Sequence, residues 1–267
     1  MKKFFFSKPF FPSHKENKMK NEGDLECSRG TFLKKKFNNL HFLLRKRFEW
    51  MNDYIRGGMK IVEIGSGSGF LKFYINEPVI LTDAIKKPWI DKVIDATNMK
   101  FKNNSIDVII ASHTIHHFYN PATFFKECSR VLKKNGVILI SETYTSLIMR
   151  IILNLMKHEG YNYDINVFDY DSICNQKNDP WSANCAIPEL LFDDEKKFNN
   201  FFSNLKIEKQ KFDEFLIFPL SGGVVSKIKM IEIPTLLLKL IDILDNFIIW
   251  TAPSIFALGK KVVIRKY

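Results

Sequence analysis

The segment 61–70, IVEIGSGSGF, decides the fold, because a short apolar run passes directly into a loop with glycine at every second position. Such a run predicts a buried strand, and a helix is expected to start at about Phe70. Glycines let a ligand approach the backbone, and a helix N-terminus attracts anionic groups. The spacing is ExGxGxG, with Glu63 two residues before Gly65. It is neither the dinucleotide fingerprint GxGxxG, which would need its third glycine at position 70, nor the phosphate-binding loop GxxxxGK[ST].

Strands and helices alternate after this loop, which predicts the α/β class with a doubly wound, mostly parallel sheet and helices on both faces. Strands are expected at 60–64, 78–82, 92–95, 106–112, 136–141, 206–219 and 256–266. Helices are expected at 31–56, 121–132, 143–157, 193–203 and 234–250. Asn120 followed by proline is a suitable N-cap for the helix that starts at 121.

The chain is expected to form one domain over 31–267, preceded by a flexible basic arm over 1–30. Within that domain, the irregular, aromatic-rich stretch 143–192 is expected to be a lid insert, and 221–252 a helical insert before the last strand. Hydrophobic residues make up 46% of the 267 residues and charged residues 26%, which is typical of a globular protein.

Charge and cysteine usage restrict the partners and the compartment. The net charge is +11, concentrated in the first sixty residues, which would attract an anionic membrane surface or a phosphorylated substrate. No nucleic-acid motif accompanies it, so nucleic acid is not expected as a partner. Four cysteines without a CxxC pair argue against a disulfide scaffold and favour the cytoplasm. No apolar run reaches the roughly 20 residues that a spanning helix needs.

Five segments together resemble one protein family. The loop ExGxGxG resembles motif I of the class I S-adenosylmethionine-dependent methyltransferases, in their small-molecule methyltransferase-domain group. The other four resembling segments are 80–83 (ILTD), 94–101 (IDATNMKF), 104–109 (NSIDVI) and 128–136 (CSRVLKKNG). In the last, Lys134 stands where proline is usual and Asn135 where the first glycine is usual. The resemblance covers about residues 40–142 and implies a Rossmann-like, seven-stranded sheet with an antiparallel last strand.

The resemblance also implies S-adenosylmethionine as the cofactor, with the glycine loop at its amino-acid end, Asp83 at the ribose hydroxyls, and Asp95 and Ala96 at the adenine. Each acid has a structural alternative: Asp83 as a turn residue, Asp95 as a cap, and Glu63 as a buried acid with satisfied hydrogen bonds. The residues expected to bind the cofactor are Glu63, Gly65, Ser66, Gly67, Gly69, Asp83, Ala84, Asp95, Ala96 and Ser112.

Three histidines follow the strand at 106–112, at the end of the sheet where this fold class binds ligands. His113, His116 and His117 are therefore candidates for a general base if the acceptor is a hydroxyl. The alternative is that they hydrogen-bond locally. No metal is expected, because no acid or cysteine shares their spacing.

The lid supplies the candidate acceptor residues. Trp181 is suited to cover a ring or sugar, and Asn184 to bond a hydroxyl, with Trp181 as a filler of the lid core as the alternative. The pattern DPWSxN…AIP…SGG…FA resembles bacterial methyltransferases of cell-envelope and surface-polysaccharide gene sets. The helix 234–250 has an unusually broad apolar face beside a narrow polar stripe of Lys239, Asp242 and Asp245. That apolar face suits packing on the sheet edge, a dimer contact or a membrane.

The expected function is transfer of a methyl group to a small-molecule or lipid-linked acceptor, including a sugar hydroxyl. The alternatives are a quinone or lipid-ring methyltransferase, an NAD-dependent oxidoreductase and a noncatalytic cofactor-binding module. A monomer or homodimer is expected in the cytoplasm, with peripheral contact at the inner membrane face as a further expectation.

Overall fold

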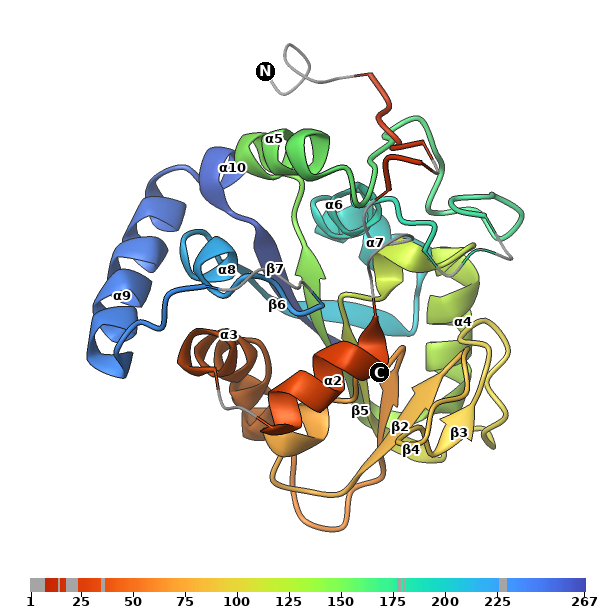
Figure 1. Ribbon diagram of the computed structural model, residues 1–267. Helices are drawn as coiled ribbons and strands as arrows, with labels where there is room; N and C mark the ends of the chain where they lie inside the picture. The colour runs from red at the N-terminus through yellow and green to blue at the C-terminus, as the bar shows by residue number, and fades with distance from the viewer. Residues whose placement is uncertain are drawn as a thin grey trace.

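A seven-stranded sheet forms the centre of the computed structural model, which describes residues 8–13, 15–17, 24–34, 37–176, 179, 181–225 and 230–267. The strand order is β3-β2-β1-β4-β5-β7-β6 (Figure 1). β7 runs antiparallel to β5 and β6, whereas the pairs among β1 to β5 are parallel, so the expected fold class is confirmed. The strands are β1 Ile61–Ile64, β2 Val79–Asp83, β3 Lys92–Val93, β4 Ile106–Ser112, β5 Leu132–Thr143, β6 Leu205–Asp213 and β7 Gly259–Lys266.

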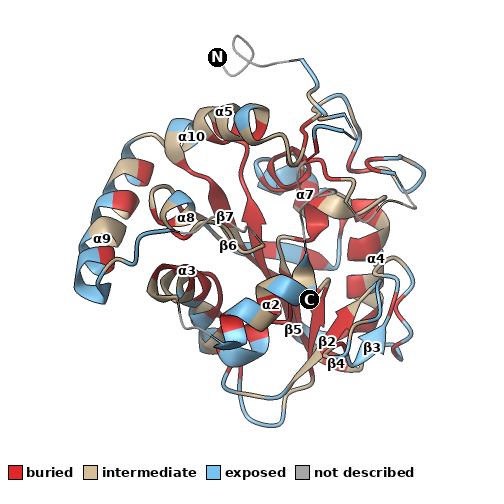
Figure 2. Ribbon diagram, viewed as in Figure 1, coloured by how far each residue is buried: buried red, intermediate tan, exposed pale blue. Residues whose placement is uncertain are grey.

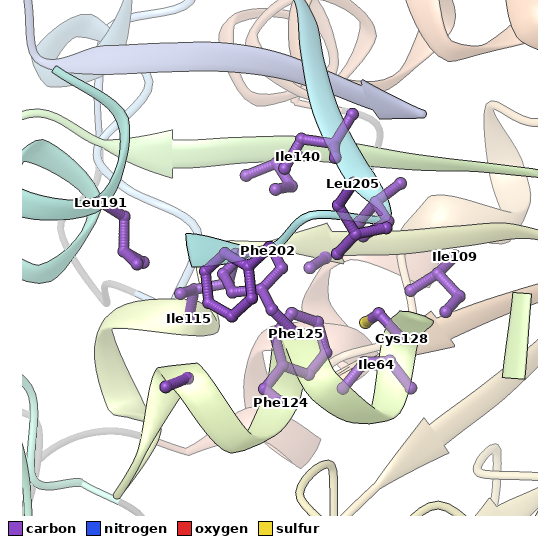
Figure 3. Close-up of a cluster of buried hydrophobic side chains, with 14 of the residues drawn as sticks. Ile64, Ile109, Ile115, Phe124, Phe125, Cys128, Ile140, Leu191, Phe202 and Leu205 are labelled. Carbon is purple, nitrogen blue, oxygen red and sulfur yellow. The ribbon is translucent and has the colours of Figure 1, made fainter. Parts of the chain in front are cut away.

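Helices cover both faces of this sheet, and the central strands β1, β4 and β5 are mostly buried, whereas β3 at one edge is exposed (Figure 2). Part of α4 is drawn in Figure 3, where Phe124, Phe125 and Cys128 pack between the strands and the segment after α7. The helices are α2 Leu25–Lys34, α3 Asn38–Phe48, α4 Pro121–Val131, α5 Leu147–Met156, α6 Ile187–Phe192, α7 Glu195–Phe201, α8 Ile217–Leu220, α9 Thr235–Thr251 and α10 Pro253–Phe256. Three 3₁₀ turns are η1 Glu49–Tyr54, η2 Leu71–Phe73 and η3 Ile115–His117.

Asn120 starts α4 and also holds the lid. Its Oδ1 accepts the backbone N–H of Thr123 at 2.8 Å, which confirms the expected N-cap. Its Nδ2 donates to the backbone carbonyls of Asp169, Tyr170 and Ser172 at 2.8–2.9 Å. The buried side chain of Asn120 therefore joins the lid insert to α4, a helix that covers the sheet.

The region before β1 differs from its prediction. The first seven residues of the expected arm lie outside the described residues, and the described part is not an irregular arm up to residue 30. Asp24 caps α2 by accepting the N–H groups of Glu26 and Cys27 at 3.0 and 2.9 Å, so the chain is already helical from residue 25. Phe10 also pairs with Tyr161 of the lid. Long-range contacts, which periodicity does not reveal, order these segments.

The helix expected at Phe70 is also absent from the structure, which has only the turn η2 at this place. Gly69 adopts φ +64°, and β2 already begins at Val79. The intervening residues 70–78 have to return to the start of β2, which pairs in parallel with β1, and are too few to do so with a full helix.

Helix α9 contacts the protein through part of its polar stripe and leaves most of its apolar face exposed. Asp245 is fully buried and accepts the backbone N–H groups of residues 215–217, while Asp242 pairs with Lys46. Lys239, the third residue of the stripe, is exposed, and most of the apolar face is also outside, where α9 stands at the margin of the molecule (Figures 1 and 2). The exposed apolar residues of α9 are Leu236, Leu237, Leu240, Ile243, Leu244, Phe247 and Trp250. In the described part of the chain, no helix is long and apolar enough to cross a membrane.

Candidate functional site

The glycine loop leaves the C-terminal end of β1 in a conformation that favours glycine. Gly65, Gly67 and Gly69 have φ values of +67°, +49° and +64°. Ser66 fixes the loop to β2, because its N–H donates to the carbonyl of Thr82 at 2.9 Å and its Oγ accepts the N–H of Thr82 at 3.1 Å. The loop therefore lies where β1 and β2 end side by side.

Asp83 lies directly against this loop. It ends β2, and its Oδ2 accepts the N–H of Gly67 at 2.9 Å while its Oδ1 accepts the N–H of Ile85 at 3.0 Å. The carboxylate remains partly exposed, and the neighbouring Ala84 is exposed. The indole of Trp89 donates to the carbonyl of Gly67 at 2.8 Å, so the segment after β2 supports the loop. Sequence reasoning missed this tryptophan, which belongs to none of the matching segments.

Glu63 is a buried carboxyl beside the loop with an unused oxygen. It is 3% exposed, and its Oε2 has no hydrogen-bond partner among the described residues. Burial, with a smaller effect from the charge of Asp83, raises the pKa of Glu63 to about 8. An orphaned carboxyl oxygen at this position fits a ligand that brings a positively charged amino group.

Asp95, Ala96 and Ser112 are placed less distinctively. Asp95 is exposed, and its Oδ1 accepts both the N–H and the hydroxyl of Thr97 at 2.8 and 2.6 Å, which is the geometry of a turn cap. Ala96 and Ser112 are half-buried, and Ser112 ends β4 opposite Ser141 of β5. Asp95 therefore caps a turn, which is the structural role that the sequence offered as an alternative to cofactor binding. Its other carboxylate oxygen can still bind a ligand.

The three histidines after β4 have different environments and do not share a regular helix. His113 has φ +48°, and burial lowers its pKa well below the usual value. His116 is buried, and its Nδ1 lies 2.6 Å from Oε2 of Glu142 at the end of β5. Burial opposes the charged form of His116, but Glu142 and Glu159 outweigh it and raise its pKa to about 10. Burial lowers the pKa of His117 to about 4.

Glu142 and Glu159 are functional candidates that sequence reasoning missed. Oε1 of Glu142 accepts the N–H groups of Thr114 and Ile115 at 2.6 and 2.5 Å, so this acid holds the turn η3 in place. Glu159 comes from the lid, and its Oε1 lies 3.6 Å from Nε2 of His116 and 3.8 Å from Nε2 of His117. The position of Glu142 at a strand end was a usable signal, whereas only the fold brings Glu159 to the histidines.

The glycine loop and the histidine turn are immediate neighbours. A Cβ atom on Gly65 would lie 2.0 Å from Oγ1 of Thr114, the residue before η3. The lid borders a cavity of about 320 Å³, and Glu159, Asn162, Asn175, Trp181 and Ser182 are among the residues that line it. Two of these residues bond η3: Asn175 donates to the carbonyl of His116 at 2.8 Å, and the carbonyl of Ser182 lies 3.1 Å from Nδ1 of His117.

Trp181 lies at this cavity, but Asn184 does not line it. The amide of Asn184 is buried and bonds the backbone N–H and carbonyl of Asn162 at 2.8 and 3.0 Å. Its own N–H donates to the carbonyl of His116 at 2.8 Å. These bonds favour a role for Asn184 in holding the lid together, in contrast to the expected hydrogen bond with an acceptor hydroxyl.

Part of this chain matches a known domain in sequence, and its fold is similar to solved structures. Residues 62–140, from β1 to β5, match the sequence model of a methyltransferase domain. No curated protein matches the chain. In structure, the chain is similar to a S-adenosylmethionine-dependent methyltransferase from Archaeoglobus fulgidus, with 17% identity, a TM-score of 0.48 and coverage of 94% of this chain and 97% of that one. It is also similar to one from Methanosarcina mazei, with 14% identity, a TM-score of 0.45 and coverage of 82% and 97%.

Proposed function

We propose that the chain is an S-adenosylmethionine-dependent methyltransferase, since residues 62–140 match the sequence model of a methyltransferase domain, and that it methylates a small acceptor held in the lid cavity. The observation that carries this proposal is the close contact between Gly65 and Thr114. That contact sets the glycine loop against the residue before η3, while Asn175 and Ser182, which line the lid cavity, bond η3 itself. Cofactor and acceptor would then meet at the C-terminal ends of β1 and β4, as expected for this fold class.

The chain's own residues suit the parts of the cofactor. S-adenosylmethionine, when bound, supplies an electrophilic methyl group on a sulfonium. We assign the amino-acid end to the loop of Gly65, Ser66, Gly67 and Gly69, with the orphaned oxygen of Glu63 facing the ammonium group. Asp83 accepts the ribose hydroxyls with its remaining lone pairs, and Asp95, Ala96, Ala84 and Ser112 border the adenine. These assignments rest on the loop geometry and on the position of each residue at a strand end.

The acceptor's reacting atom needs to be held in line with the methyl group and shielded from water. Trp181 and the asparagines of the lid cavity offer one apolar face and several hydrogen-bonding groups, which suits a polar ring such as a sugar. His116 and His117 bond residues that line this cavity, and we assign to them the positioning of the acceptor oxygen. We assign no such role to half-buried His113, whose backbone N–H donates to the carbonyl of Ser141 at 2.8 Å.

Isothermal titration with S-adenosylhomocysteine tests the cofactor site. Asp83→Ala is expected to weaken binding about 10- to 100-fold, since a charged acceptor of hydrogen bonds contributes about 1.5–3 kcal/mol. Asp91→Ala is the matched control, because Asp91 also accepts one backbone N–H, from Leu81 at 2.8 Å, but does not touch the loop. Equal losses in the two variants, or binding of NAD in place of S-adenosylhomocysteine, would contradict the assignment.

Turnover is tested separately with a labelled methyl donor and a panel of acceptors. His117→Ala is expected to leave S-adenosylhomocysteine affinity within about two-fold, because the ring of His117 bonds Ser182, which lines the cavity, and to reduce methyl transfer. Binding of the cofactor without transfer to any acceptor in the panel would favour a noncatalytic module.

We further propose that the exposed apolar face of α9 lies on an anionic membrane and that the acceptor is lipid-linked. Two observations support this proposal: the outward apolar face of α9, with Trp250 77% exposed, and the net charge of +11. A sugar on a lipid carrier combines a polar head for the lid cavity with an anchor for α9. A quinone or another lipid ring is the alternative acceptor, and the panel of acceptors in the methyl-transfer assay includes it.

Sedimentation with phosphatidylglycerol vesicles tests this surface. The double variant Leu240→Ser with Phe247→Ser is expected to reduce vesicle binding at least ten-fold, because each buried side chain is worth about 1.5–3 kcal/mol. Val93→Ser is the control, since Val93 is also half exposed but lies on β3, at the other edge of the sheet. A wild-type chain that stays in the supernatant, or a dimer that the double variant dissociates, would contradict membrane docking.

A further inference from the structure

A cluster of potential metal ligands lies between the η3 turn and the lid. His116, His117 and Glu159 each present one ligand atom, and these three atoms lie within 4.8 Å of one another. Two of the separations, from Oε1 of Glu159 to Nε2 of His116 and of His117, are 3.6 and 3.8 Å. Ligands that share a tetrahedral ion at about 2.0–2.1 Å lie roughly 3.3 Å apart, so a contraction of a few tenths of an ångström would close these two pairs around one ion.

The hydrogen bonds of both rings direct a lone pair toward this point. Nδ1 of His117 lies 3.1 Å from the carbonyl of Ser182, which only accepts, so Nδ1 carries the proton. Nδ1 of His116 lies 2.6 Å from the carboxylate of Glu142, which fixes the same tautomer whenever the ring is neutral. In both neutral rings, Nε2 is then the free lone pair. A ligand histidine whose other nitrogen donates to a carboxylate or backbone carbonyl is the usual arrangement of metal sites.

The third ligand is oriented in a similar way. Sγ of Cys185 donates to Oε2 of Glu159 at 3.1 Å, which leaves Oε1 toward the two histidines. Glu142 is held in turn by the N–H groups of Thr114 and Ile115. Every potential ligand therefore has a supporting hydrogen bond from a different part of the chain.

The charge of the cluster also suits a cation. Glu142 is fully buried and the side chain of Glu159 is 18% exposed, so two carboxylates lie around two imidazoles with little water. Buried charges require compensation, which the proton on His116 gives in part and which a dication bound to neutral histidines would give to both acids.

From these contacts we propose that His116, His117 and Glu159 bind one divalent transition-metal ion such as Zn²⁺. Two histidines and one glutamate are a ligand set typical of ions that keep an open coordination position. Glu159 and Ser182 both line the lid cavity, so the open position faces the bound acceptor. The ion also joins the lid to the η3 turn, because Glu159 belongs to the former and both histidines to the latter. Its role toward the acceptor oxygen rests on the proposed function, whereas binding of the ion does not.

The test uses the full-length chain treated with EDTA, freed of chelator and titrated with ZnCl₂ by calorimetry and with Co²⁺ by visible absorption. The wild type is expected to bind one ion, with the absorption bands of low-coordinate Co²⁺. Glu159→Gln is expected to weaken Zn²⁺ binding at least 100-fold, and Glu142→Gln about 10- to 100-fold, as supporting groups of metal ligands do.

Glu189→Gln is the matched control, because Glu189 is another buried lid acid, bonded to Thr145 and Tyr163 and outside the cluster. Circular dichroism and S-adenosylhomocysteine binding establish that each variant is folded. Wild-type affinity in Glu189→Gln supports the proposal. The absence of a saturable single site in the wild type, or equal binding by Glu159→Gln and Glu189→Gln, would overturn it. Neither result would affect the cofactor assignment, which the titration with S-adenosylhomocysteine tests without metal.

Discussion

Replacing Gly65 by alanine tests whether the glycine loop is closed against the histidine turn. The new Cβ would lie 2.0 Å from Oγ1 and 2.8 Å from Cβ of Thr114, at a backbone φ of +67°. Thr114 cannot retreat freely, because its N–H donates to the buried Glu142 at 2.6 Å. Gly67 shares the positive φ, but a Cβ there would meet nothing nearer than Leu25 at 4.0 Å.

The two alanine variants therefore separate backbone strain from steric conflict. A non-glycine residue in the left-handed region costs about 1–2 kcal/mol, which applies to both positions. Overpacking adds about 1–3 kcal/mol, which applies to Gly65 alone. Gly65→Ala should thus lose about 2–5 kcal/mol of unfolding free energy, against about 1–2 kcal/mol for Gly67→Ala.

Urea unfolding followed by circular dichroism measures both losses, and the double variant Gly65→Ala with Thr114→Ala identifies the conflict. The second substitution removes the nearest atom and should return part of the lost stability, as a coupling of about 0.5–3 kcal/mol between contacting residues. Equal losses in Gly65→Ala and Gly67→Ala, with no coupling to Thr114, would refute the close contact on which the proposed site depends.

Two further predictions concern buried acids. The folded pKa of Glu63, about 8, lies above that of an unfolded glutamate, so the contribution of Glu63 to stability should fall by up to about 1.4 kcal/mol per pH unit between about pH 4.5 and 8. Urea titrations at pH 5.5 and 7.5 should show this slope in the wild type and a smaller one in Glu63→Gln; identical slopes would speak against a protonated Glu63. Asp245→Ala should cost about 3–5 kcal/mol in the same assay, because it leaves the backbone N–H groups of residues 215–217 without their acceptor and removes a charge near Lys46. A loss below about 1 kcal/mol would show that α9 is not anchored by this carboxylate.

Local sequence patterns were sufficient to predict the sheet and its glycine loop. Apolar runs ended by turn residues gave β4 without error and the other strands among β1 to β3 within two residues, because buried parallel strands are continuously apolar. The same reasoning placed Asp83 beside the loop, since neighbouring parallel strands end at one edge of the sheet. Asn120 and the following proline located the start of α4 for an equally local reason, the capping bond.

Patterns did not reveal which face of an element is covered. The sequence left open what the apolar face of α9 meets, and in the structure Asp245 of the polar stripe finds three backbone donors in the segment after β6 while most of the apolar face is outside. Periodicity separates the polar from the apolar face of a helix, but it does not show which of the two faces packs against the rest of the protein. The choice depends on contacts with residues that are distant in the chain. The same limit applies to α2, whose Arg29 donates to the carbonyls of Ser68 and Gly69.

The α/β sheet, the glycine loop and the acids at the strand ends follow from the amino-acid sequence, because strand burial and turn chemistry act over a few neighbouring residues. The contacts of Glu159 with His116 and His117, and of Gly65 with Thr114, arise from the three-dimensional packing of the chain. Those contacts join segments more than forty residues apart, and their geometry depends on how the lid closes on the sheet, which no local preference specifies.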